Sequence, residues 1–365
     1  MDAGWRSCRD ASAMPAAKLQ SPSTMDNSMS TVRFRSFVPQ SNRLPTLQSR
    51  FSPTHHVHSP FSHNSHPLTI VSAHNARVMS SLLYESDDVV IESTHSDAGG
   101  HLSASQTLLA HAFVFSRTIS KLEDGEGRSI TANPAAVLML NQNQRYTTRP
   151  TGEVDSSVRY LVSDTVLLQL LTPFEKNVSL YRPFRFLEAA PPAATLIEER
   201  VLAEGLASGD QLDVEEAVFR ILASVIRAAY GQKRGRMSTR REIDGVEAVR
   251  EWIARNPEAN PSLPDLSSIA GLTPMKLCRA FRQRTGLTLT RFRHVLRGCL
   301  ALDLMTSGAK DLLEISLSLG YSSHSHFTYV FRRIFGEAPS AVRRRLTAPI
   351  EAATAAARSA AHASR

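Results

Sequence analysis

Residues 266–286 of the 365-residue chain read LSSIAGLTPMKLCRAFRQRTG, and residues 315–336 read ISLSLGYSSHSHFTYVFRRIFG. In each stretch, apolar residues three and four apart favour a short helix, and a glycine then permits the positive φ of a sharp helix exit. A second amphipathic helix follows. The repeat predicts two helix-turn-helix units, which we call the first unit (266–286) and the second unit (315–336). In this motif the second helix can enter the major groove of DNA.

We expect Gly271 and Gly320 at the two turns. Thr273 and Ser322 offer side-chain oxygens to cap the helices that follow, and Pro274 suits a first helical position. The expected buried anchors of these recognition helices are Leu277 and Phe281 in the first unit, and Phe327 and Phe331 in the second.

A single helix is expected between the units, over residues 289–307. At 1.5 Å per residue, roughly 18 residues span about 27 Å. Such a rod would hold two recognition helices about one DNA turn, roughly 34 Å, apart, so one subunit would read two successive major-groove segments. Gly298 lies inside this helix and costs about 1 kcal/mol relative to Ala, so we expect a softened rod.

These residues resemble the DNA-binding domain of AraC/XylS-type transcription regulators. The resemblance covers roughly the last third of the chain and is most specific from Gly320 to Arg343. Ser267 and Ser316 depart from a usual small Ala but should still allow close packing. The resemblance implies a DNA-binding transcription regulator in a bacterial cytoplasm, associated with the nucleoid. The implied partners are double-stranded DNA, RNA polymerase, a small-molecule effector and a second copy of the chain as a homodimer.

Carried over by position, the family's base-reading sites fall on Met275, Cys278, Arg279, His324, Ser325, Thr328 and Tyr329. Arg279 can donate two hydrogen bonds to guanine, and Met275 can contact a thymine methyl group. Tyr329 replaces an Arg often found there, so the second recognition helix is expected to hold mainly phosphate. The expected phosphate contacts are Lys276, Arg282, Arg332 and Arg333, with added nonspecific affinity from residues 343–345.

The charge distribution agrees with a DNA-binding C-terminal region. The chain has 42 Lys and Arg against 34 Asp and Glu, a formal net charge of +8. Residues 233–346 hold 20 of the basic and 10 of the acidic residues, so the rest of the chain carries −2. One basic module beside a nearly neutral remainder suits phosphate binding by that module.

Residues 68–181 contain short β-rich runs at 88–92, 107–119, 135–140 and 157–162, separated by turn signals. Two helices are expected next, at 192–207 and 214–230. We therefore expect a two-domain α+β protein: a cupin-like or jelly-roll domain with a helical hairpin, then an all-α domain. The apolar stripe of residues 214–230 either covers the sheet or forms a dimer interface.

The expected layout places a low-complexity, disordered extension at 1–67, a sensing and dimerisation domain at 68–230 and a linker at 231–240. The DNA-binding domain follows at 241–346, beginning with a helix over 244–255, and a disordered tail at 347–365 ends the chain. The extension lacks the apolar core of a secretory signal, and Met25 and Met29 are alternative starts.

We expect no catalytic residue, metal or cofactor. The β-rich region has His74, His95, His101 and His111 but no His-x-His pair, and His111 in an apolar run suits a satisfied core residue. The histidines between 55 and 66 lie in a Pro/Ser-rich stretch that suits a solvated segment. Two alternatives stay open: a dimeric architectural DNA-binding protein that senses nothing, and a cupin-type enzyme fused to a DNA-binding domain.

Overall fold

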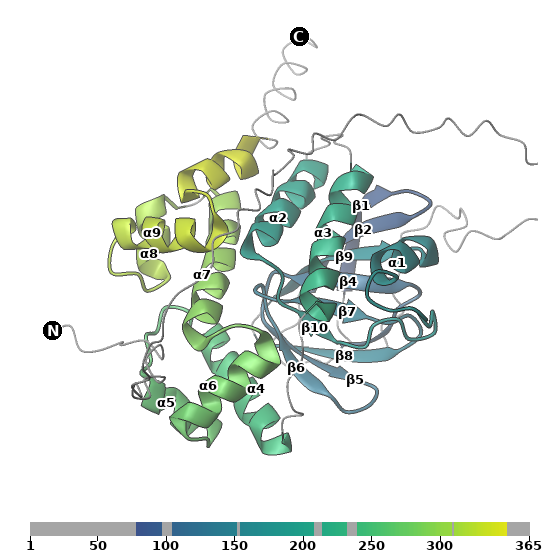
Figure 1. Ribbon diagram of the computed structural model, residues 1–365. Helices are drawn as coiled ribbons and strands as arrows, with labels where there is room; N and C mark the ends of the chain where they lie inside the picture. Colours follow the sequence, from purple (N-terminus) through teal and green to yellow (C-terminus); the bar gives the residue numbers. More distant parts are fainter. Residues whose placement is uncertain are drawn as a thin grey trace, which may run out of the picture. The chain divides into compact units, whose positions relative to one another are not determined.

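A computed structural model describes residues 78–96, 104–151, 154–207, 214–231, 239–308 and 310–348. In these ranges a β-rich region is followed by an all-helical region (Figure 1). The expected extension 1–67 with its histidines, most of the linker and nearly all of the tail lie outside the described residues. In the described part of the chain, no helix combines the length and apolarity needed to cross a bilayer.

The β-rich region consists of two antiparallel sheets. One has the strand order β1-β2-β9-β4-β7-β10 and the other β3-β8-β5-β6. The strands are β1 (Val78–Glu85), β2 (Val89–Ser96), β3 (Ala104–Thr107), β4 (His111–Ser116), β5 (Ser120–Asp124), β6 (Ser129–Ala132), β7 (Val137–Leu140), β8 (Arg145–Pro150), β9 (Asp155–Val162) and β10 (Glu188–Ala189).

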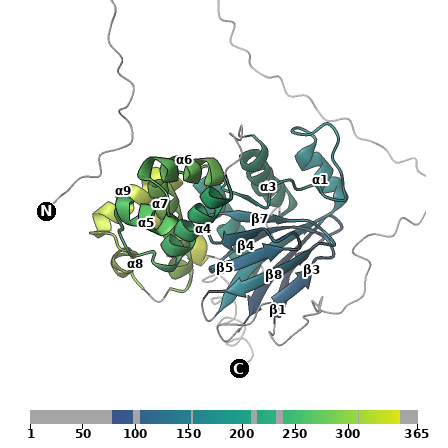
Figure 2. The ribbon, with the colours of Figure 1, turned by 90° about the horizontal axis from the view of Figure 1, so that it is seen from below.

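Alternation along the strands gives the larger sheet two buried faces. Val90 and Leu161 pack with Leu122 and Ile130 in the core between the sheets. Their neighbours, such as Ile91, face a core formed with the helices α1 (Asp164–Leu171), α2 (Ala193–Ala207) and α3 (Val214–Tyr230). Figure 2 shows α1 and α3 on one side of β4 and β7, with β8 and β3 on the other. The fold is thus the expected β-rich sandwich with helices.

Several elements of this region differ from expectation. The run 107–119 is not one strand: β3 ends at Thr107, and β4 and β5 follow as separate strands. Strands β1, β5, β6, β8 and β10 and helix α1 were not expected. By contrast, α3 has the expected bounds and α2 begins one residue late.

The apolar stripe of α3 is buried within the chain. Val218, Ile221, Leu222, Val225 and Ile226 are at most 1% exposed, in the core that they share with the sheet. The interpretation that this stripe covers the sheet is therefore right.

The helical region begins with α4 (Arg240–Arg255), which starts before the expected Asp244 and inside the expected linker. The reason is a capping box: Thr239 caps the helix and Glu242 bonds back to the backbone of Thr239. The remaining helices are α5 (Leu263–Ala270), α6 (Pro274–Thr285), α7 (Leu289–Thr306), α8 (Leu312–Ser318), α9 (His324–Phe335) and a terminal helix at 339–348. Both helix-turn-helix units and the helix between them are therefore present.

The turns confirm most of the local expectations. Gly271 and Gly320 have φ of +59° and +74°, and Pro274 opens α6. Two caps differ, however. Thr273 precedes α6 but its side chain makes no capping hydrogen bond, and α9 is capped by Ser323 rather than Ser322. The hydroxyls of Ser267 and Ser316 donate to carbonyl oxygens of their own helices, which satisfies both buried groups.

Gly298 has a packing role that the sequence did not reveal. A Cβ at this position would lie 2.0 Å and 2.4 Å from two ring carbons of Phe335, at the end of α9. Phe335 is 2% exposed, so the ring has little room to move. The expectation of a softened rod missed this reason for glycine: only glycine lets α9 approach α7 so closely.

Candidate nucleic-acid interface

The first recognition helix, α6, buries one face and exposes the other. Leu277 and Phe281 are both 0% exposed, which confirms them as anchors. Met275, Lys276 and Arg279 lie on the exposed face, and Met275 is 79% exposed although it is apolar. Arg282 is also exposed. The helix thus presents basic and apolar groups that need no partner within the chain.

Cys278 is set apart from these residues. It is half-buried and packs against the core that holds the anchors. Its thiol therefore lies at the edge of the α6 surface, whereas Arg279 is fully presented.

The second recognition helix, α9, follows the same plan with different chemistry. Its anchors Phe327 and Phe331 are at most 1% exposed. The exposed side chains are His324, Ser325, His326, Tyr329, Arg332 and Arg333. α9 therefore offers imidazole, hydroxyl and phenol groups where α6 offers Met and Arg.

Two details modify the α9 surface. The phenol oxygen of Tyr329, which is 62% exposed, accepts a hydrogen bond from Nη1 of Arg333 at 3.3 Å. Thr328 is half-buried, and its hydroxyl has no hydrogen-bond partner within the described part of the chain. Thr328 is therefore less accessible than His324, Ser325 or Tyr329.

Helix α7 joins the units, and both recognition helices contact it. Figure 1 shows α5 and α6 at its lower part, with α8 and α9 beside its upper part. Its 18 residues correspond to about 27 Å, as expected.

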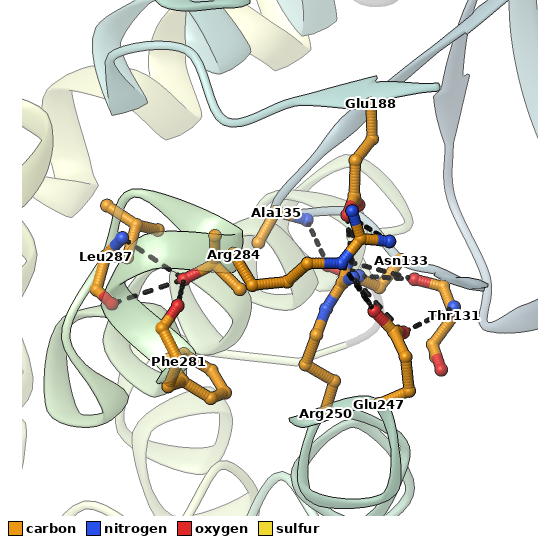
Figure 3. A network of polar contacts seen from close by, with 10 residues as sticks. Thr131, Asn133, Ala135, Glu188, Glu247, Arg250, Phe281, Arg284 and Leu287 are labelled. Atoms are coloured by element: carbon orange, nitrogen blue, oxygen red, sulfur yellow. Dashed lines mark hydrogen bonds and ion pairs between the residues drawn. The ribbon is translucent and has the colours of Figure 1, made fainter. Parts of the chain in front are cut away.

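A buried polar network lies where the α6 end of the helical region meets the sheets (Figure 3). Arg250 on α4 is 1% exposed. Its Nη2 lies 2.6 Å from Oε2 of Glu188 on β10, and its Nη1 lies 2.9 Å from Oε1 of Glu247. Arg284, in the last turn of α6, places its Nε 3.4 Å from Glu247 Oε1. We call these four residues, Glu188, Glu247, Arg250 and Arg284, the acidic–basic cluster.

Backbone groups of β6 complete the cluster. Nη2 of Arg250 donates to the carbonyl oxygen of Thr131 at 3.2 Å, and the Thr131 amide donates to Glu247 Oε2 at 3.1 Å. Burial alone would lower the pKa of Arg250, but the carboxylates of Glu188 and Glu247 outweigh it and raise that pKa above its usual value. Arg250 is therefore a permanently charged group between β10, β6 and the end of α6.

Sequence reasoning missed this cluster, although one signal was available. Val246, Val249 and Ile253 mark the inward face of α4, and Arg250 follows Val246 by four residues. A charged residue on an inward face needs a buried partner. The partners Glu188 and Thr131 are distant in the sequence, so the pattern could not name them.

His111, the histidine expected in the core, has hydrogen-bond partners for both of its ring nitrogens. His111 is 1% exposed, with Nε2 3.1 Å from the carbonyl oxygen of Leu180 and Nδ1 accepting from the amide of Gln142 at 3.0 Å. Burial lowers the pKa of His111 below its usual value. Among the residues that the structure describes, no three His, Cys, Asp or Glu side chains gather as a metal site would require.

Comparison with known proteins points to the same region. A helix-turn-helix domain family matches residues 266–345. The Tn10 TetD protein of Escherichia coli is 32% identical over 107 residues, which cover 29% of this chain and 78% of that protein. The regulatory protein SoxS of Salmonella typhimurium is 30% identical over 101 residues, or 28% of this chain and 94% of SoxS.

Longer proteins match over a smaller share of their length. The activator RhaS of Pectobacterium atrosepticum is 28% identical over 142 residues, which cover 38% of this chain and 50% of RhaS. Among solved structures, ToxT of Vibrio cholerae is similar with 16% identity and a TM-score of 0.30, covering 71% of this chain and 99% of ToxT. Because TetD and SoxS match over most of their length, this chain belongs to the AraC/XylS family of DNA-binding transcription regulators.

Proposed function

We propose that each subunit reads two successive major-groove segments of a specific DNA site, in response to a small-molecule effector. The observation that carries the first part is the arrangement of α6 and α9. Each has two fully buried aromatic or aliphatic anchors, and each exposes an opposite polar face. One continuous helix, α7, joins them.

In this proposal α6 and α9 contact different bases of the DNA site. On α6, Arg279 reads guanine and Met275 contacts a thymine methyl group, while Cys278 lines the edge of the contact. On α9, His324, Ser325 and Tyr329 face the bases, and Thr328 contributes at its margin. Lys276, Arg282, Arg332 and Arg333 hold phosphate, which gives affinity without sequence preference. The site of action is the bacterial nucleoid, with RNA polymerase as the downstream partner.

Response to an effector needs a route from the β-rich region to the DNA-binding helices, and two contacts support one. The acidic–basic cluster joins β10 to α4 and to the end of α6. The second contact joins α2 to α7, where Nη1 of Arg200 lies 2.5 Å from Oδ1 of Asp303. A ligand that changes the β-rich region would therefore bias helices that carry both units.

Selection of duplexes from random DNA by the full chain tests the DNA-binding part. The expected product is a site with two preferred segments about one helical turn apart. Replacing Arg279 by Ala should weaken binding by about 1–3 kcal/mol and relax preference at one base pair. Gln283, exposed on the same helix, gives the control variant Gln283→Ala, with little change expected.

Equal losses on the selected site and on random DNA would assign Arg279 to phosphate instead. A selected site with a single segment would contradict reading by both units.

The effector part is tested with compounds that raise the unfolding temperature of the full chain. Such a compound should also change DNA affinity. In Glu188→Gln the compound should still stabilise the protein but lose much of its effect on DNA binding. If no compound that stabilises the chain alters DNA affinity, the protein is a DNA-binding module without sensing.

A further inference from the structure

A buried arginine in the middle of α7 contacts both halves of the DNA-binding region. Arg297 is 2% exposed. Its Nε donates to the carbonyl oxygen of Pro257 at 2.5 Å, and its Nη2 donates to Ala259 O at 2.9 Å and to Asn260 Oδ1 at 3.2 Å. Its Nη1 donates to the carbonyl oxygen of Gly320 at 3.4 Å. The first three acceptors lie in the loop between α4 and α5, whereas Gly320 is the turn of the second unit.

The loop and the turn also touch each other directly. A Cβ at Gly320 would lie 1.9 Å from the carbonyl oxygen of Glu258 and 2.6 Å from its carbonyl carbon. Nδ2 of Asn260 donates to Gly320 O at 3.2 Å. The turn of the second unit therefore rests on the backbone of the loop that precedes the first unit.

The guanidinium of Arg297 is held by four uncharged oxygens and one ring. Its central carbon lies 5.2 Å from the ring centroid of Tyr321, which is 4% exposed. Burial, followed by the charge of Arg293, lowers the pKa of Arg297 to about 10. The side chain thus stays charged at neutral pH, and its buried N–H groups require these acceptors.

The equivalent turn of the first unit lacks this close backbone approach, although its Gly271 carbonyl oxygen accepts a hydrogen bond at 2.8 Å from Nη2 of Arg241, an exposed side chain on α4. Gly271 has a similar φ of +59°, but a Cβ there would meet nothing within 4 Å. Glycine at 271 is needed for backbone conformation alone, whereas glycine at 320 is also needed for close approach. The two turns therefore have the same backbone conformation but differ in whether the glycine packs against another backbone segment.

We propose that Arg297 and the Gly320 turn fix the two recognition helices at one separation and so set the base-pair spacing that the protein accepts between its two DNA segments. This inference rests on the proposed function, because spacing matters only if both units bind the same duplex. α7 alone does not settle the spacing, since the chain continues from α7 to the second unit through residues 307, 308, 310 and 311, none of which is helical. If the second unit could rotate about this connection, its effective concentration at the second DNA segment would be lower, and it would tolerate changes in the distance between the two segments.

The test measures affinity of the full chain for the selected two-segment site and for the same site with one or two base pairs inserted between the segments. For the unchanged protein we expect a loss of about tenfold or more on insertion, comparable to losing a specific base contact. Arg297→Met and Gly320→Ala should bind the original site more weakly. Their penalty for insertion should shrink to about threefold or less, as expected for loosely tethered modules.

Gly271→Ala is the control. It introduces the same unfavourable backbone conformation in the first unit, without the steric overlap. It should lower affinity for all spacings equally, leaving the insertion penalty unchanged. Asn260→Ala, which removes one exposed side chain from the contact, is the milder variant and carries the test if Arg297→Met does not fold by circular dichroism.

The outcomes separate two failures. If the unchanged protein shows no insertion penalty, the proposed two-segment reading is wrong. If it shows the penalty and Gly320→Ala and Asn260→Ala retain it in full, the spacing role of the Arg297 contact is wrong while two-segment reading stands. A reduced penalty in Gly271→Ala as large as in Gly320→Ala would also overturn the role of the contact.

Discussion

The two helix-turn-helix units have similar sequences but are held in different ways. The first unit is attached outward: Arg284 at the end of α6 reaches Glu247, in the cluster that includes Glu188 of β10. The second unit contacts α2 through α9, and it is also held within the helical region by Phe335 against Gly298 and by the Gly320 turn against Glu258. Two motifs with the same pattern of apolar residues thus have different attachments: the first shares an ion-pair cluster with β10, whereas the second packs through α9 against α7 and α2 and through the Gly320 turn against the loop before α5.

The largest expected effect comes from Arg250→Met, which breaks the attachment of the first unit. Removing this cation leaves the buried Glu188 and the half-buried Glu247 without their closest partner, which costs about 3–5 kcal/mol. Urea unfolding measures the loss, and hydrogen exchange should rise more in α5 and α6 than in α9. Arg255→Met is the control, because Arg255 is exposed and pairs only at the surface with Glu251, where the loss should be below about 1 kcal/mol.

Gly298→Ala tests the attachment of the second unit. Helix propensity alone would make this change stabilising by about 1 kcal/mol. The steric overlap with Phe335 should instead destabilise the protein by about 1–3 kcal/mol. Unfolding of Gly298→Ala, Phe335→Leu and the double variant forms a mutant cycle, in which the smaller Leu should relieve part of the loss. Additive losses would show that the two side chains do not compete for space.

His294 on α7 lets the second unit be tested by pH. Burial, then the charges of Arg293, Arg297 and His326, lower the pKa of His294 from 6.5 to about 4. Above pH 6.5 the imidazole is neutral in both states and contributes nothing to pH dependence. Between pH 6.5 and 4 the unfolded chain binds a proton that the folded chain does not, so the free energy of unfolding falls as pH falls. The loss should reach about 2 kcal/mol at pH 5.

Urea unfolding of the protein and of His294→Gln at pH 7 and pH 5 isolates this group. Between pH 7 and pH 5, the free energy of unfolding of the variant should fall by about 2 kcal/mol less than that of the unchanged protein. An equal loss in both proteins would show that His294 titrates normally in the fold.

The smallest expected effect is on the salt dependence of DNA affinity, which tests the phosphate contacts of α6 and α9. Lys276→Ala and Arg332→Ala should each reduce the slope of log K against log salt by about 0.9, because each removes one phosphate contact. Affinity at a single salt concentration should change only modestly. A change in slope for Lys276→Ala alone would mean that α9 does not hold the backbone.

The local pattern predicted the helical region well because its signals are short-range. Gly271, Gly320 and Pro274 act through backbone conformation, and Leu277, Phe281, Phe327 and Phe331 act through helical spacing, so each was recognisable within a few residues. The exposed positions of Met275, Lys276 and Arg279 followed from the same spacing. Their roles at DNA stay predictions.

What the sequence could not supply depends on distant partners. Gly298 was interpreted as a weak point because Phe335, 37 positions later, is invisible to a local pattern. Arg250 and Arg297 are nearly fully buried, and the carboxylates and carbonyl oxygens that they contact lie far away in the sequence. In the β-rich region, β1 and β8 lack clear alternation of apolar residues and were missed for that reason.

The close packing of the Gly320 turn against the backbone of Glu258 also affects the thermal unfolding of the DNA-binding region. Residues 257–260 lead into the first unit and residue 320 lies in the second, so opening the second unit or the loop before the first removes acceptors from Arg297 and leaves its charge beside unpaired carbonyls. We therefore expect the two units to unfold as one cooperative block. Amide protons of α5 and α8 should exchange through a common opening event, and no species with one intact unit should accumulate on heating.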